Sequence, residues 1–180
     1  MNREEFEHVV RSAANIVDDE IVVAGSQAVL GQFPDAPASL LRSHEVDVFP
    51  KHAPERAAEI DAAIGDGSRF HDSFDYYAHG IGPETLIAPA GWESRLIRVE
   101  LAALAKKDGC AVGWCLEIHD LLLSKLAAGR AHDLAFVRDA LEAGLADLKR
   151  LQVGIDLMPP SHRDATRTRL EGLQKQLADS

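Results

Sequence analysis

Two acids one position apart in SHEVDVFP, Glu45 and Asp47, have the clearest chemical potential in the chain. This stretch alternates acidic and apolar residues, as a half-buried strand does, so both carboxylates point to one face with Cα atoms ~6.6 Å apart. Carboxylates placed in this way repel each other unless they share a proton or bind a cation. Because oxygen ligands favour Mg²⁺ or Mn²⁺, the pair predicts a metal site. An exposed strand face without a ligand is the plainer alternative.

The turn Gly25-Ser26 could supply an anion site beside that pair. It follows the apolar run EIVVA, which suits a strand buried on both faces, and we expect Ser26 to cap a short helix over 27–31. A strand that ends in Gly lets a ligand approach the backbone, and a helix N-terminus directs free N–H groups at an anion. A triphosphate held there would bridge to the metal. An isolated Gly-Ser turn, by contrast, is more often a plain connection between a strand and a helix.

The surrounding pattern predicts an α/β (α+β) fold, with a small mixed sheet flanked by helices and a C-terminal helical segment. We expect helices over 3–18 and 54–64, strands over 20–24 and 45–49, and a turn-rich loop over 65–73. Short extended segments are expected near 74–78, 85–88, 94–101 and 110–116, with Cys110 and Cys115 as small buried strand residues. The pattern is helical from His119 onward. We therefore expect a domain over 1–118 and a helical segment over 119–180 that packs on it as one structural unit.

Composition narrows the class of protein. With 46% hydrophobic and 27% charged residues in 180, the sequence is that of an ordinary globular protein. No apolar run approaches the ~20 residues that a membrane span needs, and the start of the chain lacks the pattern of a signal peptide, so we expect a cytoplasmic protein that does not bind membranes. The net charge of −10 argues against binding along a nucleic-acid backbone. DNA is not an expected partner, whereas the slightly basic stretch 147–175 leaves RNA open.

In combination, these motifs resemble a known group of enzymes. A Gly-Ser turn that opens a helix and precedes an acid-x-acid strand resembles the signature of the polymerase-beta-type nucleotidyltransferase superfamily. The later stretch HDLLLSKLAAGRAHDLAFV is similar to the lysine-centred helical motif of AbiEii-like nucleotidyltransferases, which are toxins of bacterial toxin–antitoxin and abortive-infection systems. The resemblance runs from Ile21 to Val137, and its first part is the more specific.

The resemblance implies a metal-dependent nucleotidyltransferase that moves NMP from an NTP to a hydroxyl on RNA or protein. Its cofactor would be Mg²⁺ or Mn²⁺, and an antitoxin protein would be a partner. Carried over residue by residue, Glu45 and Asp47 bind the metal and act in catalysis, and Gly25 and Ser26 hold the nucleotide. Lys125 also contacts the nucleotide, and Lys125 and Asp133 both belong to the active site.

Each carried-over helical residue has a structural alternative. Lys125 lies amid LLLS and LAAG and could be a lysine that extends from an apolar helix face toward solvent. Asp133 could simply cap the helix that follows it.

The sequence departs from the family pattern at three points. Glu45 stands where the family usually has Asp, eighteen residues separate it from Ser26, and no acid clearly matches the third carboxylate that many relatives use as a general base. Asp75 is the best candidate for that base, followed by Glu100. Glu45 and the missing third carboxylate both favour the main alternative, a catalytically degenerate protein of the same fold that serves in binding or regulation.

A third hypothesis is a metal hydrolase built from histidine and aspartate. It requires His71 or His79, which flank the two tyrosines of HDSFDYYAHG, to converge on Asp47. Histidines in loops more often have no such role.

Overall fold

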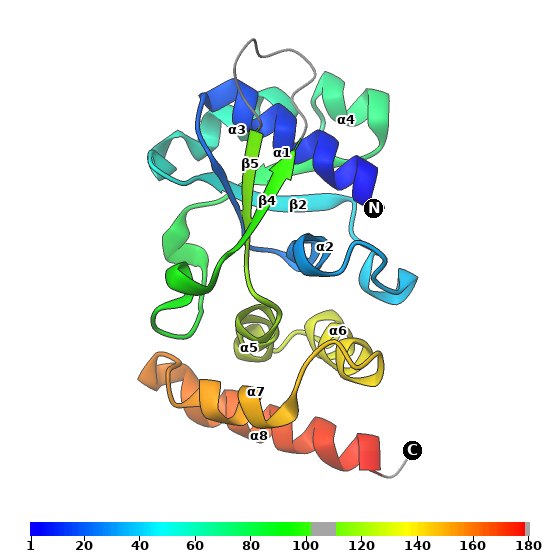
Figure 1. Cartoon of the computed structure of the whole chain (residues 1–180), viewed down its shortest axis with the longest axis vertical. Helices are drawn as coiled ribbons and strands as arrows, with labels where there is room; N and C mark the ends of the chain where they lie inside the picture. Colours follow the sequence, from blue (N-terminus) through cyan, green and yellow to red (C-terminus); the bar gives the residue numbers. More distant parts are fainter. Residues whose placement is uncertain (102–110, 179–180) are drawn as a thin grey trace. The chain divides into compact units, whose positions relative to one another are not determined.

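A computed structural model describes residues 1–101 and 111–178, which form two compact units (Figure 1). Met1–Thr85 and Leu96–Leu116 form the first, called the sheet unit below. Leu86–Arg95 and Glu117–Ser180 form the second, called the helical unit. Each unit has its own set of buried apolar side chains.

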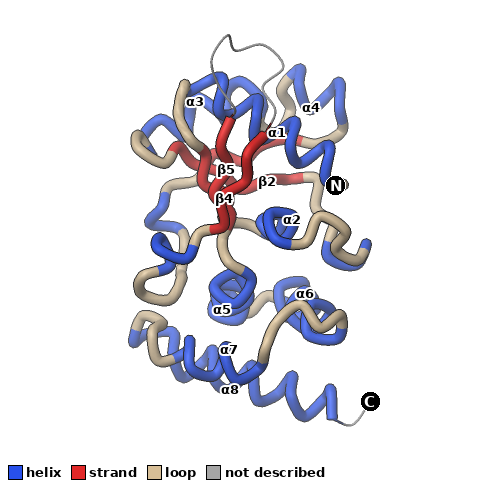
Figure 2. Tube along the Cα trace, viewed as in Figure 1, coloured by secondary structure: helices blue, strands red, loops and turns tan. Residues whose placement is uncertain are grey.

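The sheet unit is built on one mixed sheet, whose strands are red in Figure 2. The strand order is β3-β2-β1-β5-β4. β1 pairs in antiparallel fashion with β2 and in parallel with β5, while β2 and β3 are parallel and β4 and β5 antiparallel. This architecture confirms the predicted α/β class. The strands are β1 Ile21–Val23, β2 Glu45–Pro50, β3 Tyr77–Gly80, β4 Ile97–Leu101 and β5 Ala111–Cys115.

Four α-helices of the sheet unit surround these strands within the described residues: α1 Arg3–Val17, α2 Val29–Gln32, α3 Ala57–Ile64 and α4 Arg69–Phe74. The sequence fixes the start of α1 through a capping box, in which Asn2 accepts from the Glu5 backbone N–H and the Glu5 side chain accepts from that of Asn2. The apolar residues of α1 recur at helical spacing and are buried, and α1 lies against β2, β5 and α3.

The helical unit contains α5 Ile118–Ala128, α6 Ala131–Glu142, α7 Leu148–Ile155 and α8 Pro160–Ala178. α5 contacts each of the other three helices, which explains why it is apolar nearly all round. Gly129 ends α5 in the left-handed region at φ 69°, and Arg169 of α8 donates to the free carbonyls of Leu126 and Ala127. None of the helices described in the chain is long and apolar enough to span a membrane.

Three local predictions are wrong. The segment 65–73 is not all loop, because Ser68 accepts from the His71 N–H and caps α4. No strand forms over 85–88, because its first residue ends a 3₁₀ turn, Pro83–Thr85, and Pro89 follows the segment. Ser26 is not a helix cap; it is the first residue of a 3₁₀ turn, Ser26–Ala28, with Gly25 at the cap position. Cys115 is buried on β5 as expected, and Cys110 lies outside the described residues.

Candidate metal and nucleotide site

Three potential metal ligands meet on one face of the sheet unit. Glu45 and Asp47 alternate on β2, and the parallel register sets His79 of β3 directly beside Asp47. His79 Nδ1 lies 3.0 Å from Asp47 Oδ1 and 3.7 Å from Glu45 Oε1. One ligand atom from each residue falls within 4.8 Å of the others, and all three side chains are partly exposed to solvent. We call Glu45, Asp47 and His79 the β2–β3 cluster.

The strands hold this cluster by burying the residues between its members. Val46, Val48 and Ala78 are fully buried, so the alternation of each strand directs the ligand side chains to the opposite face. A shift of one residue in either strand would bury a charged side chain in place of an apolar one. The buried face therefore specifies the register that brings the cluster together.

The two neighbouring acids shift the pKa values of the titratable groups in and beside the cluster. Burial and the nearby charge of Asp47 raise the pKa of Glu45, against the opposing effect of a 2.9 Å hydrogen bond that Tyr77 Oη donates to it. Burial lowers the pKa of His79, but the hydrogen bond to Asp47 and the charges of both acids outweigh it, so that this pKa is raised. Burial and the bond to Glu45 raise the pKa of Tyr77 to about 12. The cluster thus favours positive charge at its centre.

The Gly25-Ser26 turn adjoins the cluster. The Ala24 N–H donates to Asp47 O at 3.0 Å, which sets the end of β1 next to the middle of β2. A Cβ atom added to Gly25 would lie 1.9 Å from Asp47 Oδ2, so only glycine leaves room for the carboxylate in this position. The backbone at Gly25 has φ −85°, which any residue can adopt. Glycine is required here by close approach and not by its backbone angles.

A buried glutamine, Gln27, connects the Gly25-Ser26 turn to the residues just before β2. Gln27 is fully buried, and its Nε2 donates to the carbonyl of Ser43 at 3.1 Å. Ser43 Oγ in turn accepts from the N–H of Glu45. The eighteen residues between Ser26 and Glu45 therefore form a loop whose two ends are joined next to the cluster, and the length of the gap does not separate the two halves of the motif.

Other acids and histidines considered from the sequence lie outside the cluster. Asp75 ends α4 in the left-handed region, its side chain is 88% exposed, and it faces His44 at 3.5 Å. Glu100 on β4 pairs with Arg98. His71 pairs with Asp66. Among the described residues, the third position of the cluster is thus filled by His79. From the sequence, convergence of His79 on Asp47 was considered only for the hydrolase hypothesis. The expected extended segment 74–78 ended before His79, so the alternation of Tyr77 and His79 on a strand was not used.

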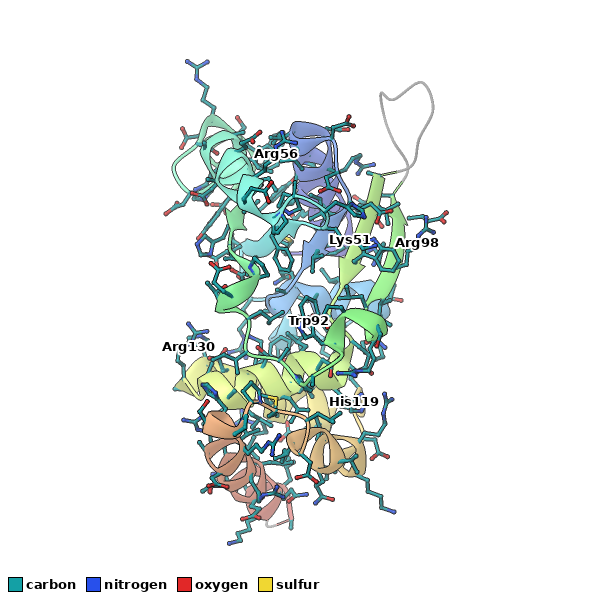
Figure 3. All side chains as sticks on the ribbon, turned by 90° about the vertical axis from the view of Figure 1, so that its left-hand side faces the viewer. Lys51, Arg56, Trp92, Arg98, His119 and Arg130 are labelled. Atoms are coloured by element: carbon teal, nitrogen blue, oxygen red, sulfur yellow. The ribbon has the colours of Figure 1, made fainter. Side chains whose placement is uncertain are left out.

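Lys125 and Asp133 belong to the helical unit and bind each other. Lys125 Nζ lies 3.1 Å from Asp133 Oδ1. Arg130, which is labelled in Figure 3 at the start of α6, donates to Asp133 Oδ2 at 2.7 Å. The Asp133 side chain is 1% exposed and that of Lys125 is 10% exposed. Lys125 also lies over the Phe136 ring at 4.8 Å. This geometry gives both residues a role in joining α5 to α6, and their part in an active site stays a prediction.

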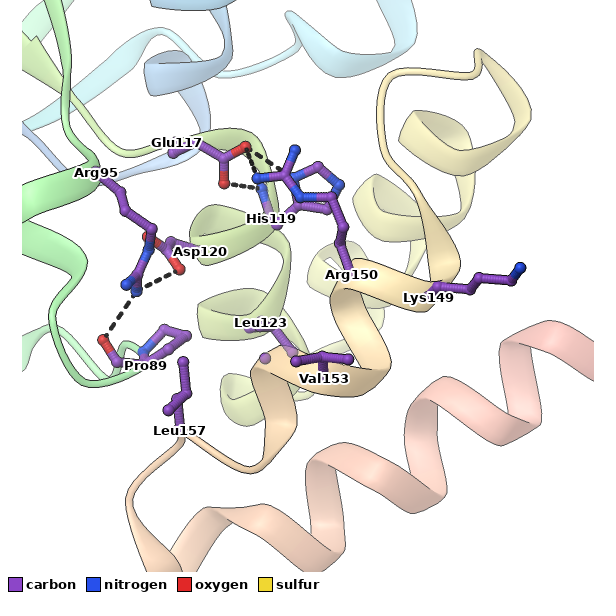
Figure 4. A pocket seen from close by; sticks show the side chains of 11 residues that line it. Pro89, Arg95, Glu117, His119, Asp120, Leu123, Lys149, Arg150, Val153 and Leu157 are labelled. Atoms are coloured by element: carbon purple, nitrogen blue, oxygen red, sulfur yellow. Dashed lines mark hydrogen bonds and ion pairs between the residues drawn. The ribbon is translucent and has the colours of Figure 1, made fainter.

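The helical unit also has a cavity of about 310 Å³, lined by residues of the Pro89–Arg95 loop, α5 and α7 (Figure 4). Five of its charged or titratable residues, Arg95, Glu117, His119, Asp120 and Arg150, are paired with one another. Arg95 forms a two-pronged contact with Asp120, and His119 Nδ1 lies 2.7 Å from Glu117 Oε1 while its Nε2 accepts from the Asp147 N–H. Such satisfied pairs are typical of a structural polar network. In the β2–β3 cluster, by contrast, one potential ligand atom from each of three residues lies within 4.8 Å of the others.

Comparison with known proteins places the chain in a family but matches no individual protein. No curated protein and no solved structure gives a significant match to the chain. Residues 4–167, which include both the β2–β3 cluster and the lysine-centred helix, match the family described as nucleotidyltransferase of unknown function (DUF6036). Since the match extends over most of its length, the chain belongs to this nucleotidyltransferase family.

Proposed function

We propose that the protein is a metal-dependent nucleotidyltransferase that moves a nucleoside monophosphate from an NTP to a hydroxyl on RNA or protein. The observation that carries the proposal is the contact between the two halves of the motif, with the Gly25 Cα directly against the carboxylate of Asp47. A triphosphate on the turn and a cation on the acids would then be immediate neighbours. Membership of the family supports a nucleotide as the substrate.

The residues present fit a divalent cation. Glu45 and Asp47 supply hard oxygen ligands. Burial and the neighbouring charge of Asp47 raise the pKa of Glu45, and a bound cation would favour the ionised form of both acids. When bound, Mg²⁺ or Mn²⁺ would neutralise the triphosphate and favour in-line attack at the α-phosphorus.

In the proposed reaction, the acceptor hydroxyl oxygen bonds to the α-phosphorus, the bond from that phosphorus to the bridging oxygen breaks, and pyrophosphate leaves. The hydroxyl proton passes to solvent. The chain's own residues orient the groups that react: the Gly25-Ser26 backbone holds the phosphates, Asp47 and Glu45 hold the cation, and Tyr77 fixes Glu45 through its hydrogen bond. Asp75, expected from the sequence as a base, lies outside the cluster at the end of α4.

The experiment is transfer of label from each α-³²P-NTP to total cellular RNA and protein, with Mg²⁺ or Mn²⁺. We expect label on one acceptor class with the wild type, reduced roughly 10²–10³-fold in Asp47→Asn because a charge that stabilises the transition state is lost. Asp72→Asn, an exposed acid of α4, is the matched control and should leave transfer unchanged. Persistence of transfer in Asp47→Asn would refute the proposed site.

The same experiment separates two alternatives. A catalytically degenerate binding protein is favoured by Glu45 in place of Asp and by histidine at the third position, and it predicts NTP binding without transfer. A metal hydrolase is favoured by the convergence of His79 on Asp47. In parallel reactions, it predicts release of phosphate from γ-³²P-NTP and no labelled acceptor from α-³²P-NTP. We propose nucleotidyl transfer over both because the chain belongs to a nucleotidyltransferase family.

The similarity of the lysine-centred helix to AbiEii-like enzymes supports a further element of the proposal, a role as the toxin of a toxin–antitoxin pair. Expression of active enzyme should then arrest growth, and Asp47→Asn should not. An antitoxin protein would be the partner, and it would relieve the arrest when expressed together with the enzyme. Unimpaired growth with active enzyme would refute this role and leave the proposed chemistry untouched.

A further inference from the structure

We propose that His79 is a third protein ligand of the metal ion, and that the site therefore prefers a divalent transition ion, with Mn²⁺ as its probe, over Mg²⁺. This inference rests on the proposed function, since it concerns the same cation. It differs from an arrangement of carboxylates alone, which the resemblance implies.

The distances in the cluster suit a shared ion. An octahedral ion with bonds of about 2.1 Å holds neighbouring ligand atoms about 3.0 Å apart and opposite ones about 4.2 Å apart. His79 Nδ1 lies 3.0 Å from Asp47 Oδ1 and 3.7 Å from Glu45 Oε1. Both separations fall within that range, so one ion could contact all three residues after small side-chain adjustments.

The position of His79 is set by the fold and not by a flexible loop. It lies on β3 between the buried Ala78 and Gly80, and a Cβ atom on Gly80 would lie 2.2 Å from the Ala57 carbonyl of α3. α3 thus lies close against β3 at this point, and the Gly80 N–H also donates to Asp61 of α3 at 3.2 Å. A ligand on a strand that is held in this way is well placed for metal binding.

The chemistry of the ligands decides the preference. Mg²⁺ is a hard ion that is bound through oxygen and keeps much of its water. Imidazole nitrogen suits divalent transition ions, and carboxylates suit both classes. One histidine among two carboxylates therefore adds affinity for Mn²⁺ that Mg²⁺ gains to a smaller extent. The half-exposed side chains leave room for water and a nucleotide as further ligands.

A second histidine in the sheet unit offers a matched control. His52 Nδ1 lies 2.6 Å from Asp19 Oδ1, so it forms the same kind of imidazole–carboxylate contact. The Asp19 side chain also accepts from the backbone N–H groups of Glu20, His52 and Ala53. Asp19 and His52 are not part of a group of three or more ligands within the described residues. If an imidazole–carboxylate pair alone were enough to bind Mn²⁺, then substitution of either His52 or His79 would weaken Mn²⁺ binding. We expect this loss only for His79.

The test is calorimetric titration of the full-length protein with Mn²⁺ and with Mg²⁺, together with pulsed EPR of bound Mn²⁺ to detect coupling to ¹⁴N. We expect tighter binding of Mn²⁺ with ¹⁴N coupling in the wild type. His79→Asp should abolish the coupling and lower the preference for Mn²⁺ over Mg²⁺ on the order of tenfold. His79→Ala should weaken Mn²⁺ binding, and His52→Ala should change neither measurement.

The outcomes separate this inference from the proposed function. Suppose that Mn²⁺ binding depends on Asp47 but shows no ¹⁴N coupling, and that His79→Asp leaves the ratio of Mn²⁺ to Mg²⁺ affinity unchanged. This result would overturn the role of His79 and leave the proposed function standing. Coupling that is lost in His52→Ala and kept in His79→Ala would overturn it as well. Absence of Mn²⁺ and Mg²⁺ binding to the wild type would overturn the inference and the proposed metal site together.

Discussion

The pair formed by Lys125 and Asp133 allows a stability prediction that also bears on whether these residues are structural. Two unit charges 3.1 Å apart attract by about 5 kcal/mol at an effective dielectric constant of 20, a gain that the desolvation of both groups largely offsets. Removal of one partner is a different matter, because the other charge is left buried. Asp133→Asn would leave the Lys125 ammonium, which is 10% exposed, without a counterion.

We expect Asp133→Asn to lower the free energy of unfolding by about 3 kcal/mol at pH 7, near the lower end of the range for a broken buried pair. The lower end applies because Arg130, the second partner, is 66% exposed and loses little. The double substitution Lys125→Met, Asp133→Leu should cost less than the single one, since no buried charge remains. Asp156→Asn, which removes an exposed partner of Arg167, is the control and should cost under about 0.5 kcal/mol.

The difference should also depend on pH. Burial raises the pKa of Asp133, but the hydrogen bonds and charges of Arg130 and Lys125 outweigh it and hold this pKa below 3.8. The ionised Asp133 therefore stabilises the native state above its unfolded pKa, and this contribution is lost as the pH falls through the lowered pKa. The deficit of Asp133→Asn should be largest near pH 7 and shrink below about pH 4.

Urea unfolding measured by fluorescence can assign this effect to its unit. Trp92 lies in the helical unit and Trp114 in the sheet unit, so Trp114→Phe leaves Trp92 as the fluorescent reporter of the helical unit. A loss of less than about 1 kcal/mol for Asp133→Asn at pH 7 would refute the structural reasoning for this pair.

Three further predictions concern the sheet unit. Gly25→Ala should weaken Mn²⁺ binding about tenfold, measured by calorimetry, because the new Cβ displaces the carboxylate of Asp47. The free energy of unfolding, measured in urea, should change by less than about 1 kcal/mol. Unchanged affinity for Mn²⁺ would contradict the close contact between Gly25 and Asp47. In a pH titration at 295 nm, the last tyrosine should ionise near pH 12 and Tyr77→Phe should remove that step; complete ionisation near pH 10 would contradict the bond to Glu45. Cys115 is buried, and burial raises its pKa to about 12. In a Cys110→Ser background, Cys115 should therefore react with an aromatic disulfide at least about 10³-fold more slowly in native than in unfolded protein. Fast reaction of the native protein would show that the Cys115 thiol is accessible to solvent.

Much of the fold could be predicted because its signals are local. The helical spacing of α1 and the alternation of acid and apolar residues in β2 each follow from a short stretch of sequence. The prediction that Glu45 and Asp47 share a face depended only on that alternation. The loop predicted over 65–73 failed because its turn residues hid a cap, Ser68, followed by a short helix.

The third member of the cluster was expected only in the hydrolase hypothesis, as either His71 or His79, because its identity depends on the pairing of strands far apart in the chain. His79 meets Asp47 through the parallel register of β2 and β3. The alternation within each strand determines which side chains share a face, but it does not say which strands pair or which residues lie opposite each other. A search for a third carboxylate directed attention to Asp75, which lies two residues before β3 begins. The roles assigned to Lys125, Asp133 and the Gly25-Ser26 turn are still predictions, although the turn lies where its role requires.

The most direct test of the site is crystallographic. Crystals grown with Mn²⁺ and a non-hydrolysable NTP analogue should show an anomalous Mn²⁺ peak within coordination distance of the Glu45 and Asp47 carboxylates. The triphosphate should lie on the backbone N–H groups that follow Gly25. An anomalous peak at any other place, or a nucleotide bound away from this turn, would contradict the account.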